Sequence, residues 1–380
     1  MNPNTPNLFE YATKELAQDA ALAYILAWSE PAYRECHQGL HQLGTAVLNA
    51  LGYWFRGRRV RRRLHRLGTA MLHALLATRI GESGVPTVTS VRVETQVDGI
   101  DLLVRINDEN EEGLVLLVED KLDTDEHSEQ IARYLESARM RFPNREIVPV
   151  YVKTGNASLW RFPSEKECGR FLRRDLLDVL DRFPNTGNTV VDNFRAHLQV
   201  WEDETNSYRH TLPSKWNYRA MEGFYSELQY RMRKEYQWDF GDWLYVPNPA
   251  GGLLCFYFAE NAIKRQPYET TMYLQIELSV DVNRLTVRLS EKRGPGIRAP
   301  LMYQMLELLK NNARHSDGIE VNKAGRFRGG ASGAVAEVTF GDKECYLARK
   351  DGGIIDMEAT IRRLDLARQF VSNVAHSYSD

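Results

Sequence analysis

The chain has 380 residues, which is enough for two domains or for one large domain with an extension. Its composition, 43% hydrophobic and 26% charged, is that of a soluble globular protein, and a net charge of −2 excludes nucleic-acid binding through bulk positive charge. No apolar run approaches the ~20 residues of a membrane span, and four cysteines without a CxxC pair give neither a zinc signature nor a disulfide framework. We expect a cytoplasmic protein with no signal peptide and no membrane partner.

The N-terminal segment is expected to be helical. Residues 8–30 have apolar spacing near 3.6. Residues 40–51, LHQLGTAVLNAL, nearly recur at residues 64–75 as LHRLGTAMLHAL, 24 positions later. Both copies predict amphipathic helices in which glycine and alanine stand at positions that suit close helix packing. We interpret them as two similar helices joined by the segment between them.

That joining segment is strongly basic. No Asp or Glu occurs from Cys36 to Gly81, and the stretch RGRRVRRRLHR contains seven arginines. A local basic footprint of this kind attracts phosphates. The candidate nucleic-acid-binding residues are Arg56, Arg58, Arg59, Arg61, Arg62, Arg63 and Arg66. A solvated helix face or a site for a partner protein is the alternative.

The next part of the chain alternates between strand and helix signals. The expected order is β-rich 87–106, a polar turn 107–113, a buried strand 114–121, a helix 125–142, a buried strand 146–155, and helices 169–182 and 189–206. This order predicts an α/β domain with a small mixed sheet flanked by helices.

From about residue 210 the pattern changes to an α+β type with an antiparallel sheet. The expected elements are a helix within 215–238, strands within 252–260, 268–280 and 284–292, a helix 298–314, a glycine-rich loop 322–334, strands around 334–348 and a helix 356–377. We therefore expect an N-terminal domain of residues 1–207 and a C-terminal domain of residues 215–380, with the boundary in 206–215.

The strand LVLLVEDK, residues 114–121, carries an acid and a lysine where a buried strand should end. Because the preceding turn centres on residue 110, paired residue numbers across it should add to about 220, which places Asp101 opposite Glu119. Directly opposed β-carbons lie ~5 Å apart. Lys121 is two residues beyond Glu119 and shares its face, whereas Asp120 points to the other face.

Two carboxylates and an ammonium that converge in this way suggest a metal site. Two close carboxylates repel, and one would stay protonated unless a cation lies between them. Hard oxygen ligands suit Mg²⁺, which proteins usually hold through one or two carboxylates. A lysine beside the ion can orient a water or stabilise charge on a phosphate.

These residues resemble the PD-(D/E)XK nuclease superfamily, in which an Asp precedes a (D/E)xK motif on the neighbouring strand. Here the motif is Asp101 followed by Glu119 and Lys121, with Ile100 where the superfamily often has proline. Gln130 and Tyr134 form a QxxxY pair on one face of the next helix, as in the lambda-exonuclease-like and RecB-like branches. The resemblance covers roughly residues 15–210.

The resemblance implies a restriction-endonuclease-like core and hydrolysis of phosphodiester bonds. Asp101 and Glu119 would hold Mg²⁺ or Mn²⁺, and Lys121 would position or activate the attacking water. Gln130 and Tyr134 would hold the lysine and the phosphate in place. DNA is favoured over RNA as the substrate, and a bacterial defence or restriction role is one setting for it. A catalytically silent module that binds nucleic acid or a partner is the alternative.

The C-terminal domain is expected to recognise the target or a partner, which includes a second copy of the chain or another protein. Weaker candidates for the site lie in the N-terminal part. Glu94 could add a metal contact or be an acid at the sheet edge, and Glu30 or Glu35 could supply an acid from the first helix. Lys153 and Thr154 end a neighbouring strand, where they could touch phosphate.

Overall fold

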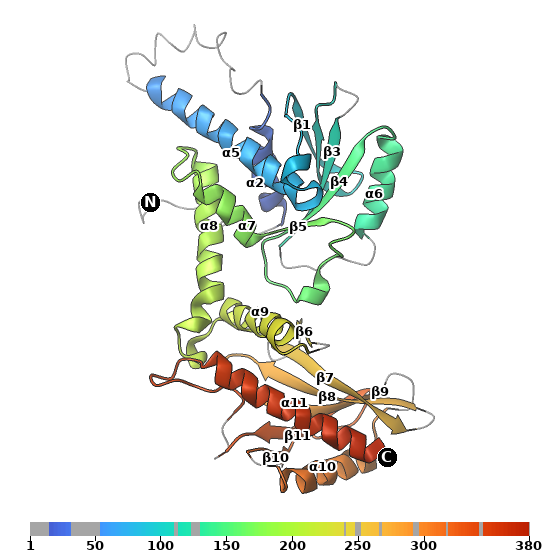
Figure 1. Ribbon diagram of the computed structural model, residues 1–380. Helices are drawn as coiled ribbons and strands as arrows, with labels where there is room; N and C mark the ends of the chain where they lie inside the picture. The colour runs from blue at the N-terminus through green and yellow to red at the C-terminus, as the bar shows by residue number, and fades with distance from the viewer. Residues whose placement is uncertain are drawn as a thin grey trace. The chain divides into compact units, whose positions relative to one another are not determined.

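The computed structural model describes residues 15–31, 54–109, 113–122, 130–238, 241–247, 252–265, 268–291, 296–316, 318–341 and 345–379. The chain divides into two compact units (Figure 1). One comprises residues 1–155 and 161–202, and the other comprises residues 156–160 and 203–380. Within the described ranges, no helix is both long and apolar enough to cross a membrane.

The first unit is built on a mixed sheet in the order β1-β2-β3-β4-β5. The first three strands are antiparallel neighbours, and the last two run parallel to β3. The strands are β1 Val91–Val97, β2 Ile100–Ile106, β3 Leu114–Lys121, β4 Glu146–Lys153 and β5 Gly169–Leu172. The predicted α/β class and small mixed sheet are confirmed.

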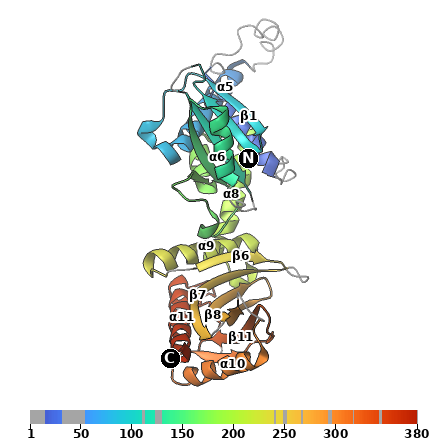
Figure 2. The ribbon, with the colours of Figure 1, turned by 90° about the vertical axis from the view of Figure 1, so that its right-hand side faces the viewer.

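Helices cover both faces of this sheet, which is why β3 is buried along its whole length (Figures 1 and 2). Side chains such as Leu116 and Val118 pack into a core with one set of helices, whereas Leu117 packs on the opposite face. The first face is covered by α2 Glu15–Ala27, α5 Trp54–Ile80, α7 Arg173–Asp181 and α8 Thr189–Asn206, and the second by α6 Gln130–Arg141.

Two expectations for this unit were wrong in detail. The segment 169–182 is not one helix, because residues 169–172 form β5 along the free edge of β4 before α7 begins. Phe171 is buried there against the sheet, which favours the extended conformation. The arginine segment is also not a linker, since it lies within α5, which continues through the second copy of the near-repeat. The first copy, residues 40–51, lies outside the described residues.

Helices α2 and α5 approach each other closely at Gly68. A β-carbon at this position would lie 2.6 Å from the main-chain oxygen of Ile25 and 2.6 Å from the nitrogen of Ser29. Only glycine allows the two backbones to come this near. The glycine that was expected to suit helix packing therefore does so in the second copy.

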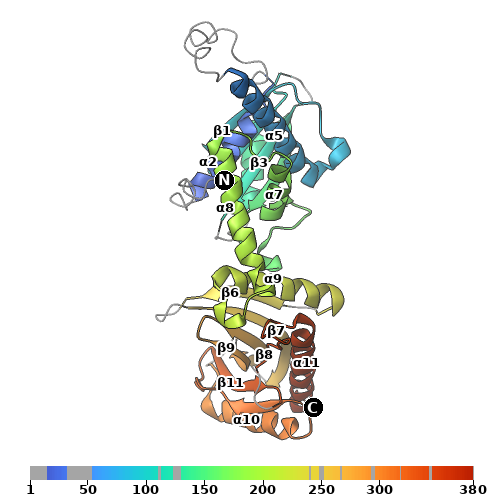
Figure 3. The same ribbon diagram turned by 90° about the vertical axis from the view of Figure 1, so that its left-hand side faces the viewer.

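The second unit contains an antiparallel sheet in the order β10-β11-β9-β8-β7-β6 (Figure 3). Its strands are β6 Gly241–Val246, β7 Leu253–Arg265, β8 Tyr268–Leu278, β9 Asn283–Glu291, β10 Glu320–Lys323 and β11 Ser332–Thr339. The helices α9 Tyr218–Glu235, α10 Ala299–Ala313 and α11 Met357–Ser379 share one apolar core with a face of this sheet. The expected α+β class is confirmed, although β6 and β10 were not predicted and β11 ends at Thr339 rather than near residue 348.

Candidate active site

The hairpin of β2 and β3 has the predicted register. Leu102 pairs with Val118 and Leu103 with Leu117, so paired residue numbers add to 220. The next position in this register places Asp101 opposite Glu119. Because side chains alternate along a strand, Glu119 and Lys121 share the face of Leu117, toward α6.

Both carboxylate oxygens of Asp101 are held. Oδ2 accepts a hydrogen bond from the main-chain N–H of Asp120 at 2.9 Å, and Oδ1 accepts one from the side-chain amide of Gln96 at 3.1 Å. Lys121 Nζ lies 3.8 Å from Oδ2. The ladder of β2 and β3 thus ends in a side-chain contact that fixes the Asp101 carboxylate against the next strand.

Glu119 is fully buried and forms an ion pair with Lys121, which is itself about nine-tenths buried. Burial raises the pKa of Glu119 to about 7, despite the opposing effect of the hydrogen bond from Lys121. The ammonium of Lys121 therefore lies near two carboxylates. The lysine compensates part of their charge, which explains how a core strand tolerates an acid and a lysine at its end.

The donor set fits a divalent cation. Oε2 of Glu119 is buried without a hydrogen-bond partner among the described residues, although a buried carboxylate oxygen normally has one. Together with Asp101 it offers hard oxygen ligands, and Mg²⁺ usually takes its remaining ligands from water and phosphate. Among the described residues there is no group of three or more His, Cys, Asp or Glu side chains arranged for a metal. Asp101 and Glu119 would therefore hold the ion as a pair.

Gln130 and Tyr134 meet each other on α6. The amide of Gln130 donates to the hydroxyl of Tyr134 at 2.8 Å. The hydroxyl also lies over Gly99, where an added β-carbon would be 3.2 Å from it. The pair therefore covers the turn that leads into Asp101.

The opposite face of β3 carries a second acidic pair that sequence reasoning missed. Asp120 is fully buried and accepts a hydrogen bond from Gln18, which also accepts one from the hydroxyl of Thr154. Burial, followed by the neighbouring carboxylate of Asp19, raises the pKa of Asp120 well above its usual range. Gln18 and Asp19 come from α2, and the signal available in the sequence was two adjacent polar residues within an apolar helix.

The two acidic groups are connected through Gln96 in β1. Its side-chain amide donates to Asp19 at 3.2 Å as well as to Asp101 at 3.1 Å. Gln96 has a positive φ of 53°, which is uncommon for a residue other than glycine. The unusual backbone brings the amide to both carboxylates.

The weaker candidates lie in different surroundings. Lys153 is buried and pairs in the parallel ladder with Lys121, so it stands at the same end of the sheet. Glu94 is instead ion-paired with Arg105 at 3.0 Å and with Arg141 at 3.3 Å. Glu30 accepts a hydrogen bond from the first N–H of β1 and so caps that strand. Glu35 lies outside the described residues.

The arginines of α5 lie on the other side of the sheet from Glu119 and Lys121, because α5 packs against the face of Leu116 and Val118. Arg63 donates to the main-chain oxygen of Asn185 at 2.8 Å. Arg61, Arg62 and Arg66 also fall within the described part of the helix. The side chains of Arg56, Arg58 and Arg59 lie outside it.

Comparison with known proteins gave one family. Residues 71–221 match the family model described as the PD-(D/E)XK nuclease superfamily. No curated protein and no solved structure matches the chain. The matched segment contains the hairpin with Asp101, Glu119 and Lys121 as well as the QxxxY pair of α6. This segment, and the candidate active site within it, therefore belongs to the PD-(D/E)XK nuclease superfamily.

Proposed function

We propose that the chain is a metal-dependent nuclease that hydrolyses phosphodiester bonds. The observation that supports this most strongly is the cluster of Asp101, Glu119 and Lys121 at one end of the sheet, inside the superfamily segment. Mg²⁺ or Mn²⁺ bound to the two carboxylates would polarise the phosphate and lower the pKa of the attacking water.

The side chains of the cluster have different roles in this proposal. Asp101 and Glu119 hold the cation. Lys121 cannot be a ligand, because an ammonium has no lone pair to donate. Its charge orients the water and stabilises the negative charge that develops on the phosphate. The hydrogen-bonded pair of Gln130 and Tyr134 keeps α6 over the turn before Asp101 and offers a hydroxyl to the lysine and the phosphate.

The proposed substrate is DNA in preference to RNA, which follows from the superfamily rather than from a particular residue. The arginines of α5 gather the phosphate backbone through a salt-dependent attraction that is independent of sequence. The second unit, residues 203–380 with 156–160, selects the target or a partner, such as a second copy of the chain. A cytoplasmic role in bacterial defence or restriction is consistent with a nuclease unit that is joined to a recognition unit.

The test is a cleavage assay of the purified chain. Supercoiled plasmid, linear duplex, single-stranded DNA and RNA are each incubated with Mg²⁺, Mn²⁺ or EDTA. Cleavage that requires a divalent cation supports the proposal, and the four substrates distinguish DNA from RNA and endonuclease from exonuclease activity. A chain that binds nucleic acid without metal and cleaves none of the four substrates is instead a binding module.

A single substitution ties the activity to the cluster. Lys121→Ala should lower the cleavage rate by ~10²–10³, the usual cost of losing one well-placed electrostatic group, while binding of nucleic acid and metal persists. Lys166→Ala removes the same charge from an exposed position of the same unit and should leave cleavage unchanged. Equal rates for the two variants would remove Lys121 from the mechanism.

A further inference from the structure

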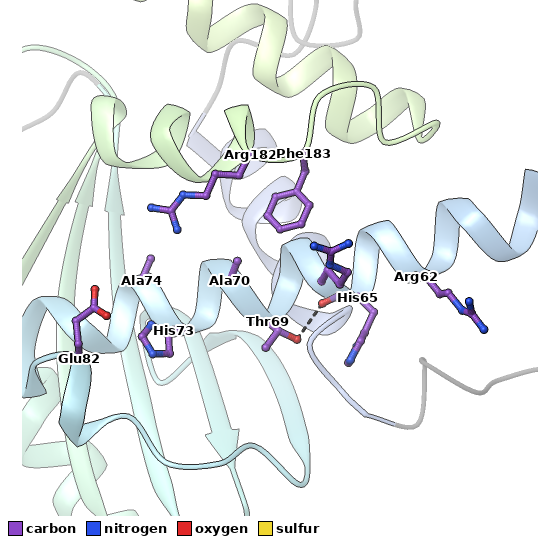
Figure 4. A pocket seen from close by; sticks show the side chains of 10 residues that line it. Arg62, His65, Thr69, Ala70, His73, Ala74, Glu82, Arg182 and Phe183 are labelled. Carbon is purple, nitrogen blue, oxygen red and sulfur yellow. Dashed lines mark hydrogen bonds between the residues drawn. The ribbon is translucent and has the colours of Figure 1, made fainter.

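A groove of about 1000 Å³ lies between α5 and the end of α7 (Figure 4). Its lining includes Arg62, His65, Arg66 and His73 from one flank of α5, and Arg182 and Phe183 from the segment that ends α7. The volume is within the range of small-molecule sites, roughly 300–1,000 Å³. None of these residues belongs to the cluster around Lys121.

The groove exists because small residues form its floor. Ala70 and Ala74 stand on α5 where the helix faces α7, and Figure 4 shows them between the two helices. Longer side chains at these positions would fill the space. The adjacent face of α5 carries Leu67, Met71 and Leu75, which are buried in the core. This packing fixes the position of the helix, and with it the groove on its outer flank.

The net charge of the groove is positive. Arg62, Arg66 and Arg182 are exposed, and within the described part of the chain none of them is ion-paired with a carboxylate. Many other described arginines are paired in this way, such as Arg173 with Glu202 at 3.0 Å. Glu82 is the one acid in the lining, so three guanidinium groups against one carboxylate leave a net charge of +2.

We propose that this groove is a second binding site, separate from the metal cluster, for a phosphate-bearing ligand of nucleotide size. Guanidinium groups match phosphate oxygens in geometry and charge. The ring of Phe183, with the guanidinium of Arg66 5.9 Å from its centre, offers an apolar surface for a base or sugar beside the cations. The groove and the metal cluster lie on opposite faces of the sheet, so a ligand held here does not occupy the catalytic position.

The phosphate could belong to a free nucleotide or to the backbone of a nucleic-acid substrate. The two sources share the same chemistry at the groove and differ in what competes for it. The proposal does not depend on nuclease activity, because it rests on the groove alone.

The experiment is calorimetric titration of the full chain in EDTA, which removes any contribution of a bound divalent cation. The probes are pyrophosphate, ATP and a 20-base-pair DNA duplex. We expect the wild type to bind ATP, and the double substitution Arg66→Gln with Arg182→Gln to weaken this binding by at least about tenfold, since a hydrogen bond to a charged group contributes ~1.5–3 kcal/mol. The double substitution Arg133→Gln with Arg139→Gln, at two exposed arginines on α6, removes the same charge, so it is the control and should bind as the wild type does.

A second variant tests the space rather than the charge. Ala74→Leu fills the floor of the groove while every arginine remains, so it should also weaken ATP binding, and its thermal transition shows whether the fold is intact. Wild-type protein that binds neither ATP nor pyrophosphate would overturn the proposal, as would an equal loss of ATP binding in the control variant on α6.

The remaining outcomes identify the source and keep the two proposals apart. If the groove variants weaken duplex binding together with ATP binding, the phosphate is that of the nucleic-acid backbone, whereas duplex binding that is unchanged assigns the groove to a free nucleotide. Lys121→Ala should bind ATP as the wild type does. If the chain binds ATP in EDTA and cleaves nothing, the groove proposal stands and the nuclease proposal fails. If the chain cleaves nucleic acid but binds no phosphate probe, the nuclease proposal stands and the groove proposal fails.

Discussion

The side-chain amide of Gln96 holds the carboxylate of Asp101, with a hydrogen bond of 3.1 Å to Oδ1. The same nitrogen donates to Asp19 at 3.2 Å, so both amide hydrogens have an acceptor. The other oxygen of Asp101 accepts from the main chain of β3 at 2.9 Å. Asp101 is thereby fixed from two sides before any cation arrives.

The first prediction concerns this support. Gln96→Ala should lower metal affinity and cleavage by ~10–100-fold, the usual effect of removing a group that orients a metal ligand. Titration with Mn²⁺ and a cleavage assay measure the two effects. Gln96→Gly should lose the same support, but should be the more stable of the two variants, because glycine adopts the positive φ of 53° without the ~1–2 kcal/mol cost paid by other residues. A Gln96→Ala variant with wild-type metal affinity would show that Asp101 needs no such support.

The second prediction concerns the buried pair of Asp120 and Asp19. The folded-state pKa of Asp120 is raised above its unfolded value, so the stability that its protonated form contributes is present at low pH and is lost as pH rises through the folded pKa. Asp120→Asn keeps an oxygen that can accept from Gln18 and cannot ionise. Urea unfolding should therefore show the variant to be more stable than the wild type at pH 8.5, with a smaller difference at pH 5. A larger advantage at pH 5 would contradict the assignment.

The core of the site could be read from the sequence because it depends on local rules. The register of β2 and β3 follows from the turn between them, and the alternation of side chains then places Glu119 and Lys121 on one face. The spacing of Gln130 and Tyr134 gives one helix face in the same way, and the structure shows them hydrogen-bonded to each other. Each inference needed only residues close together in the sequence.

The missing parts depend on contacts between distant segments. Gln18 lies 102 residues before Asp120, and nothing in a helix pattern says which strand its buried polar side chain will meet. Gln96 reaches Asp101 only through a positive φ that its residue type does not predict. Residues 169–172 form a strand of four residues, too short for periodicity to distinguish from the start of a helix. The groove beside α5 forms only because the end of α7 packs next to it, so it could not be predicted before the position of α7 was known.

The third prediction concerns the contact of α2 and α5. Gly68→Ala would place a β-carbon 2.6 Å from the main chain of Ile25, so the helices must separate. Overpacking of this kind costs about 1–3 kcal/mol, which exceeds the gain in helix propensity of about 1 kcal/mol. Thermal unfolding measures the loss, with Thr69→Ala, an exposed neighbour on the same helix, as the control. Because α2 carries Gln18 and Asp19, the separation of the helices should also disturb Asp120. A Gly68→Ala protein that is as stable as Thr69→Ala would rule out a close approach of α2 and α5.

The last prediction concerns proton competition at Glu119. A carboxylate must be deprotonated to bind a cation, and burial raises the pKa of Glu119 to about 7. Below that pH, the apparent affinity for Mn²⁺ should fall by about tenfold per pH unit, because one proton is displaced for each ion bound, whereas above pH 8 it should level off.

In EDTA, the free energy of unfolding should depend on pH with the opposite sign. The folded state binds the proton more tightly than the unfolded state, so the free energy of unfolding should fall as pH rises from about 4.5 to about 7. Glu119→Gln, which cannot ionise, should lose this part of the pH dependence along with most of the metal affinity. Calorimetric titration at pH 6, 7 and 8 measures the first effect and urea unfolding the second. An Mn²⁺ affinity that is equal at pH 6 and pH 8 would mean that Glu119 is not the ligand.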